Sequence, residues 1–209
     1  MRILIADDEL LFADMLEAYL ARLDDVTVDK APSLEAVASR AQRGDQYDMV
    51  ILEAQTPGMN GLDGLVKTRS YFPQTSIALL SDDADPQIVR DAFRLGADGF
   101  IPKKSMRGNT MLNALRLMLA GDRYVPSMIV PEMSAQDKAP ERKPYLSPRE
   151  TDVVFRVKAG FSNKQIATEL GISPVTVALH LRRVFKKIGA KNRTDAVRII
   201  TERGLFTSR

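Results

Sequence analysis

The sequence predicts an α/β domain followed by a small all-α domain, and three observations lead to this prediction. Over residues 1–126, short apolar runs of strand length alternate about five times with segments of helical period. Residues 127–144 are rich in proline and polar side chains and have no apolar period, which is typical of a linker. Residues 145–209 carry helical patterns throughout. We therefore expect a doubly wound five-stranded parallel sheet, a linker and four helices.

The net charge of +3 conceals two parts of opposite sign. Residues 1–126 contain 14 Lys+Arg and 19 Asp+Glu, a net charge of −5, whereas residues 145–209 contain 13 and five, a net charge of +8. A small domain with this excess of positive charge is expected to bind a polyanion.

The composition also excludes several classes of protein. The chain has no cysteine, so neither a disulfide nor a thiolate metal site can form. No apolar stretch approaches the roughly 20 residues that span a bilayer, and Asp7 and Asp8 come too early for a signal peptide. We expect a cytoplasmic protein without membrane contact.

The elements of the first domain follow from apolar runs and from apolar residues at helical spacing. Ser33 is a residue type that caps helices, and Pro-Gly and Asn-Gly pairs mark the loop near residue 60. The expected strands cover residues 3–6, 26–28, 49–52, 77–80 and 99–102, and the expected helices cover 10–23, 34–41, 62–71, 86–95 and 107–120.

The sequence of the second domain predicts four helices separated by turn residues. Ser147 and Ser162 are expected to cap the first two helices, Pro174 to begin the third, and Thr194 to cap the fourth. The expected helices cover residues 148–160, 163–170, 174–188 and 195–203. The second and third, joined by a tight turn at Gly171, predict a helix-turn-helix.

Polar side chains lie at the ends of four predicted strands. Asp7 and Asp8 follow the first strand, Glu53 the third, Ser81 the fourth and Lys103 the fifth. Each could have a simpler role, as a helix cap or a solvated surface charge. Because the carboxyl ends of parallel strands meet at one edge of the sheet, the set predicts a pocket. Carboxylates suit Mg²⁺, and the hydroxyl and ammonium groups suit phosphoryl oxygens.

About the first 120 residues resemble the receiver domain of two-component response regulators, which has a flavodoxin-like fold. The matching motifs are Asp7-Asp8, Pro57-Gly58-Met59-Asn60-Gly61, Leu79-Leu80-Ser81 and the run from Gly96 to Lys103. The resemblance implies that Mg²⁺ binds, that a phosphoryl group is sensed, and that an aromatic ring reorients. The positions matching these roles are Asp7, Asp8 and the carbonyl of Gln55 for Mg²⁺, Ser81 and Lys103 for the phosphoryl group, and Phe100 for the ring.

Glu53 departs from this family, which has an aspartate as the phosphoacceptor. The longer side chain could pair with Lys103 and accept a hydrogen bond from Ser81, which would partly imitate a phosphorylated aspartate. A glutamate carries at most one negative charge, whereas a phosphoryl group adds about −1.5 to −2, so a partial bias toward the active state is expected. Three readings stay open: a natural regulator independent of phosphorylation, a natural or introduced mimic of the active state, and a pocket retained only for folding.

The segment from Leu146 to Ile200 resembles the LuxR-type helix-turn-helix of the NarL/FixJ response regulators. The motifs are Leu146-Ser147-Pro148-Arg149-Glu150, the run from Gly160 to Ala167, Leu170-Gly171-Ile172-Ser173, Thr176-Val177, His180-Leu181 and the run from Asn192 to Val197. The resemblance implies binding to double-stranded DNA as a homodimer on a roughly palindromic site, with the last helix at the dimer contact. It also implies a histidine kinase or another protein as partner.

The third helix of this domain presents two faces. An apolar face of Val177, Leu181, Val184 and Ile188 is expected in the core, and a basic face in the major groove of DNA. The predicted DNA-contacting residues are Asn163, Lys164, Thr176, Leu179, Arg182, Arg183 and Lys186. Ala178 stands where the family usually has lysine, so one groove contact is missing.

These patterns predict a transcriptional regulator without catalytic residues. Two rivals belong to other classes. A phosphatase-like enzyme would use Asp7 or Glu53 as nucleophile and would turn over a phosphoester with Mg²⁺. An adaptor that is defective in phosphorylation would act through protein partners and bind DNA weakly, and Ala178 favours this rival.

Overall fold

The computed structural model describes residues 1–23, 25–105, 109–127, 146 and 148–202. The chain divides into two compact units, Met1–Glu141 and Arg142–Arg209. The predicted linker of residues 127–144 lies outside the described residues apart from Ser127, and so does the predicted cap Ser147.

The first unit contains a five-stranded sheet in which all pairs of neighbouring strands are parallel. The strand order is β2-β1-β3-β4-β5, which is the order of flavodoxin-like folds and confirms the predicted fold class. The strands are β1 (Arg2–Ala6), β2 (Thr27–Ala31), β3 (Met49–Glu53), β4 (Ser76–Ser81) and β5 (Gly99–Pro102).

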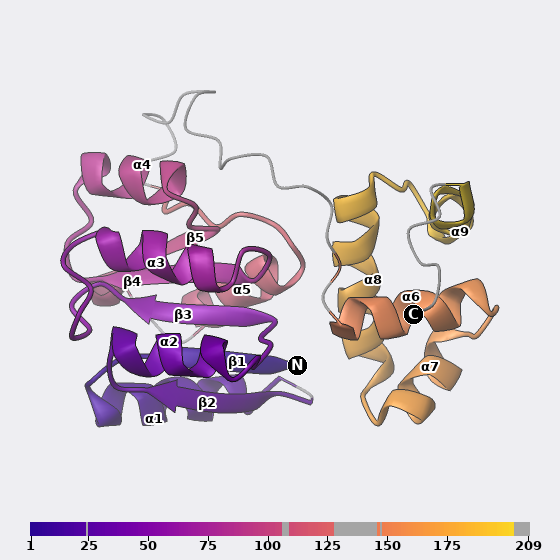
Figure 1. Cartoon of the computed structure of the whole chain (residues 1–209), viewed down its shortest axis with the longest axis horizontal. Helices are drawn as coiled ribbons and strands as arrows, with labels where there is room; N and C mark the ends of the chain where they lie inside the picture. Colours follow the sequence, from indigo (N-terminus) through magenta and orange to yellow (C-terminus); the bar gives the residue numbers. More distant parts are fainter. Residues whose placement is uncertain (24, 106–108, 128–145, 147, 203–209) are drawn as a thin grey trace. The chain divides into compact units, whose positions relative to one another are not determined.

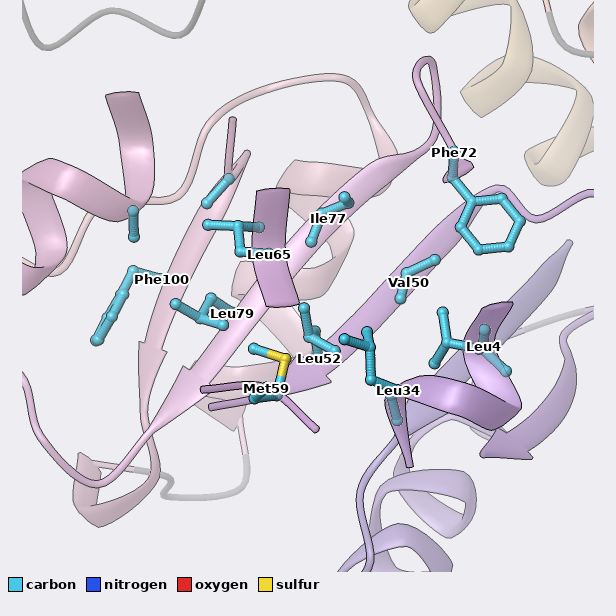
Figure 2. Packing of buried hydrophobic residues seen from close by; sticks show 14 of the residues in the cluster. Leu4, Leu34, Val50, Leu52, Met59, Leu65, Phe72, Ile77, Leu79 and Phe100 are labelled. Carbon is cyan, nitrogen blue, oxygen red and sulfur yellow. The ribbon is translucent and has the colours of Figure 1, made fainter. Parts of the chain in front are cut away.

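Helices cover both faces of this sheet (Figure 1). Side chains alternate along each strand, so Leu4 and Val50 enter one core cluster while Ile3 and Ile51 enter the other. Figure 2 shows the cluster that contains Leu4, with residues of several strands and helices meeting side by side. The helices α1 (Leu10–Leu20) and α5 (Asn109–Leu119) cover one face, and α2 (Leu34–Gln42), α3 (Asp63–Tyr71) and α4 (Pro86–Arg94) the other.

Two predicted elements of the first unit differ from the structure by more than two residues at one end. The strand predicted at residues 26–28 is longer, because β2 continues through Asp29 and Lys30 to Ala31. The strand lies at the sheet edge, where these charged side chains form ion pairs, Asp29 with Arg2 at 2.7 Å and Lys30 with Asp14 at 2.5 Å. The first helix, predicted to reach Leu23, ends at Leu20.

The second unit contains the predicted helices, α6 (Pro148–Lys158), α7 (Asn163–Leu170), α8 (Pro174–Ile188) and α9 (Arg193–Glu202). Ser162 caps α7 in a reciprocal capping box with Gln165, and Gly171 ends that helix with a φ of 63°. The predicted core face of α8 is buried. The predicted cap Thr194 is wrong: it lies inside α9, and Asn192 Oδ1 instead accepts a hydrogen bond from the Asp195 N–H at 2.9 Å.

Within the described parts of both units, no helix combines the length and the apolar composition that crossing a membrane requires.

Candidate functional site

The predicted pocket residues lie at the carboxyl ends of the strands of the first unit. Glu53 and Ser81 are the last residues of β3 and β4, Asp7 directly follows β1, and Lys103 directly follows β5 in the short 3₁₀ turn η1 (Lys103–Ser105). Asp7 and Glu53 are each only 2% exposed. Asp8, in contrast, is exposed. The sheet thus brings two buried carboxylates to one edge.

Glu53 uses its two oxygens for different contacts. Its Oε2 accepts a hydrogen bond from the Gln55 N–H at 2.5 Å, so the carboxylate turns back over the loop that follows β3. Its Oε1 lies 3.3 Å from Lys103 Nζ. The predicted pairing of Glu53 with Lys103 is therefore present in the structure.

Lys103 is surrounded by groups that favour a cation. Besides Glu53, its Nζ lies 3.7 Å from Asp7 Oδ2 and 4.6 Å from the centre of the Phe12 ring. The face of an aromatic ring carries negative charge density, so Phe12 attracts the ammonium group as the carboxylates do. The Lys103 side chain is only 12% exposed, which limits competition from water.

The pocket holds more negative than positive charge. Burial raises the pKa of Glu53, and Lys103 and the Gln55 N–H oppose that rise. Burial also raises the pKa of Asp7, opposed by the Glu9 N–H and by Lys103. Asp7 Oδ2 and Glu53 Oε1 are buried and accept no hydrogen bond within the described part of the chain. Two carboxylates that share one ammonium leave an acidic site.

This donor set has the chemistry that Mg²⁺ needs. Mg²⁺ prefers hard oxygen ligands and usually keeps several waters, so a site requires only one or two carboxylates. Among the described residues, no three acidic or histidine side chains gather closely enough to hold a metal ion. A Mg²⁺ ion here would therefore depend on Asp7 and Asp8, together with a main-chain carbonyl such as that of Gln55.

Ser81 and Phe100, the predicted switch residues, are both buried. Ser81 is 5% exposed, and its Oγ accepts a hydrogen bond from the Asp83 N–H at 3.1 Å. The predicted hydrogen bond from Ser81 to Glu53 is absent among the described residues, because the Glu53 carboxylate turns toward Gln55 instead. Phe100 is fully buried beside Leu79 in the core cluster (Figure 2).

Two pocket residues were missed by the sequence analysis. Phe12, on α1, packs against Lys103 from 91 positions away in the sequence. Thr56 is buried, and its Oγ1 donates to the carbonyl of Ala6 at 3.0 Å, which ties the loop after β3 to the end of β1. Thr56 could have been predicted from its position in the loop that follows β3. In the sequence, Phe12 shows only the apolar character of a helix residue, which does not indicate a pocket.

In the second unit, the predicted DNA-contacting residues differ in exposure. Lys164, Arg182 and Lys186 are exposed, and Asn163 and Leu179 are half-buried. Thr176 and Arg183 are buried, with 2% and 6% exposure. The prediction that Arg183 lies on an open basic face therefore needs correction. Thr176 takes part in the helix cap, because its N–H donates to Ser173 Oγ at 3.1 Å.

The helix-turn-helix is held together by polar contacts between its helices. Lys187 of α8 pairs with the buried Glu150 of α6, with 2.7 Å between Nζ and Oε2. Arg149 donates from Nη2 to the carbonyl of Leu170 at 2.8 Å, at the end of α7. These contacts fix α6 against both helices of the motif.

Comparison with protein families gives one match for each unit. Residues 3–116 match the response regulator receiver domain. Residues 144–200 match the bacterial regulatory proteins of the luxR family.

Several curated proteins resemble the chain over nearly its whole length. The glycerol metabolism activator of Pseudomonas putida is 32% identical, with 94% of this chain and 93% of that protein covered. The nitrate/nitrite response regulator protein NarL of Escherichia coli is 30% identical, with 98% and 96% covered.

Solved structures show the same fold. The RcsB response regulator of Salmonella typhimurium has a TM-score of 0.57 at 21% identity, covering 96% of this chain and 99% of that one. A LuxR family DNA-binding response regulator from Silicibacter pomeroyi has a TM-score of 0.55 at 26% identity, covering 61% and 98%.

Proposed function

The chain belongs to the response regulators that join a receiver domain to a LuxR-type helix-turn-helix, and we propose that its receiver favours the DNA-binding state without phosphorylation. Membership of this family makes the chain a DNA-binding regulator of transcription and not an enzyme. The proposal concerns what replaces the phosphoryl signal.

The contact between Glu53 and Lys103 is the observation that supports this proposal. In the family a phosphorylated aspartate presents anionic oxygens to the lysine after β5. Here the Glu53 carboxylate, 3.3 Å from Lys103 Nζ, presents an anionic oxygen without a phosphoryl group. Because Glu53 forms no hydrogen bond with Ser81 and carries at most one charge, the bias is partial.

The remaining roles are part of the same proposal. Asp7, Asp8 and the Gln55 carbonyl would hold Mg²⁺, which would supply positive charge at the pocket, and Ser81 and Phe100 would form the switch. The protein would act in the cytoplasm as a homodimer on a roughly palindromic site, with a histidine kinase or another protein as partner. Contacts to DNA would come from the predicted residues that are not buried, Asn163, Lys164, Leu179, Arg182 and Lys186.

Selection of bound DNA from a random pool tests the proposal. The full-length protein is used as purified, without a phosphodonor, at physiological salt, and a variant with Arg182→Ala and Lys186→Ala serves as the control. We expect a defined, roughly palindromic motif that the control does not recover. Recovery of no motif by the wild-type protein would contradict the proposal, and would favour an inert pocket or a phosphorylation-defective adaptor that acts through protein partners.

A further inference from the structure

Arg193 connects two distant parts of the helix-turn-helix unit. It is the first residue of α9, and its guanidinium reaches the segment that begins α7. Its Nη1 donates to Asn163 Oδ1 at 3.2 Å, and its Nη2 donates to the carbonyl of Phe161. One side chain thus binds two acceptors that lie 30 and 32 positions earlier. A guanidinium is suited to this, because its donors form a rigid planar fork.

This contact fixes the orientation of the Asn163 amide. A guanidinium only donates hydrogen bonds, so the amide atom that faces Arg193 must be the oxygen. The amide nitrogen, Nδ2, then lies on the other side of the group. No group in the described part of the chain accepts a hydrogen bond from Nδ2. This nitrogen is also not fully buried, so solvent can reach it. Asn163 therefore keeps two N–H donors that no group in the described part of the chain uses.

The surroundings of Asn163 favour an anion. Asn163 is the first residue of α7, where the helix carries partial positive charge, and the neighbouring Lys164 is exposed. Phosphate oxygens of DNA accept hydrogen bonds from amide side chains at such positions. We propose that Arg193 is a positioning residue for DNA binding, which holds the Asn163 amide so that Nδ2 donates to a backbone phosphate. This inference rests on the proposed contact between Asn163 and DNA.

Two other roles for Arg193 must be distinguished from this one. It could serve only the stability of the unit, or it could itself contact a phosphate. Asn163→Asp separates stability from DNA binding, because a carboxylate still accepts from Arg193 but cannot donate and repels phosphate. Arg193→Lys separates positioning from charge, because lysine keeps the charge but loses the fork that holds two acceptors.

The test measures fluorescence anisotropy of a labelled random-sequence duplex with the full-length protein over a range of salt. Asn163→Ala is expected to weaken binding at least about tenfold, the lower end of the range for one hydrogen bond to a charged group. Asn163→Asp is expected to weaken it further, while its urea midpoint stays at or above that of the wild type. Arg193→Lys alone is expected to weaken binding as much as Asn163→Ala does. In a protein that already carries Asn163→Ala, Arg193→Lys is expected to weaken binding by no more than about a further twofold. Arg198→Lys, on the exposed face of the same helix, is the control.

Several outcomes would overturn the inference. The inference is wrong if Arg193→Lys or Asn163→Asp binds DNA with wild-type affinity. It is also wrong if Arg193→Lys weakens binding as much in the presence of Asn163→Ala as it does alone. If the wild-type protein binds no duplex at any salt concentration, the proposed function fails. The orientation is then tested by the side-chain NH₂ resonances of Asn163 in the full-length protein, which Arg193→Lys must shift. Unchanged resonances would refute the inference independently of DNA.

Discussion

Replacement of Glu53 by aspartate is the most direct test of how this receiver works. The change removes one methylene and therefore retracts the carboxylate by about 1.5 Å, the length of one carbon–carbon bond. The distance to Lys103 Nζ, now 3.3 Å, would grow to roughly 4.8 Å. Aspartate also restores the residue that the family phosphorylates.

The expected size of the effect follows from Coulomb's law. With an effective dielectric constant of about 20, the lengthening weakens the attraction between the two charges by about 1.5 kcal/mol. If that attraction sets the bias toward the DNA-binding state, Glu53→Asp without a phosphodonor should bind a single half-site about tenfold more weakly than the wild type. Acetyl phosphate with Mg²⁺ should restore the affinity of the variant and leave that of the wild type unchanged.

Anisotropy titration of a half-site of the selected DNA motif, with and without acetyl phosphate, measures these affinities. Glu35→Asp is a matched control, because Glu35 is exposed on α2 and the same methylene is removed there. Two results would refute the reasoning. Wild-type affinity of Glu53→Asp without the phosphodonor would show that the ion pair does not set the state. A gain in wild-type affinity with the phosphodonor would show that phosphorylation still governs it.

Three further predictions concern stability and the environment of Lys103. Because burial raises the pKa of Glu53 above its ordinary value of 4.5, the contribution of Glu53 to stability is lost as pH rises through the folded-state pKa, so Glu53→Gln should gain stability relative to the wild type as pH rises above about 4.5. Urea midpoints check this, and a relative loss over that range would mean that pairing with Lys103 outweighs burial. Phe12→Leu should speed the acylation of the Lys103 amine, because it removes a contact between the ring and the ammonium group worth about 0.5–2 kcal/mol. Phe12→Tyr keeps the ring and should react at the wild-type rate. Peptide mass spectrometry measures both acylation rates. Glu150→Gln should lower the urea-derived stability of the helical unit by about 2–3 kcal/mol, because Lys187 loses its buried partner, and replacing both residues by methionine should recover most of the loss.

The sequence predicted the sheet because its strands are buried on both faces and therefore read as continuous apolar runs. β2 was the exception, since an edge strand tolerates charges such as Asp29 and Lys30 and thus loses the apolar signal. The pocket positions were predictable for a related reason. Parallel strands bring their carboxyl ends to one edge, so residues that follow strands are placed by topology alone.

The direction of each side chain could not be predicted in the same way. The turn of Glu53 toward the Gln55 N–H, in place of Ser81, depends on the loop conformation after β3. The contacts of Phe12 with Lys103 and of Arg193 with Asn163 join segments that are distant in the sequence. The residues next to Phe12 and Arg193 in the sequence do not predict these contacts. Exposure of Arg183 was predicted from its position on the helix, but the structure buries it.

A tenfold bias per receiver is small, and its consequence depends on assembly. Moving a two-state equilibrium from 1:99 to 99:1 requires roughly 10⁴-fold preference, which a single weakened or strengthened ion pair does not supply. If two copies bind one palindromic site, the DNA-bound state requires both receivers, and the two biases multiply to about a hundredfold. The ratio of wild-type to Glu53→Asp affinity on a full site should therefore be about the square of the same ratio on a half-site. Affinities of the wild type and Glu53→Asp for half-sites and full sites measure this relation directly, and equal ratios on both would mean that the receivers act one at a time.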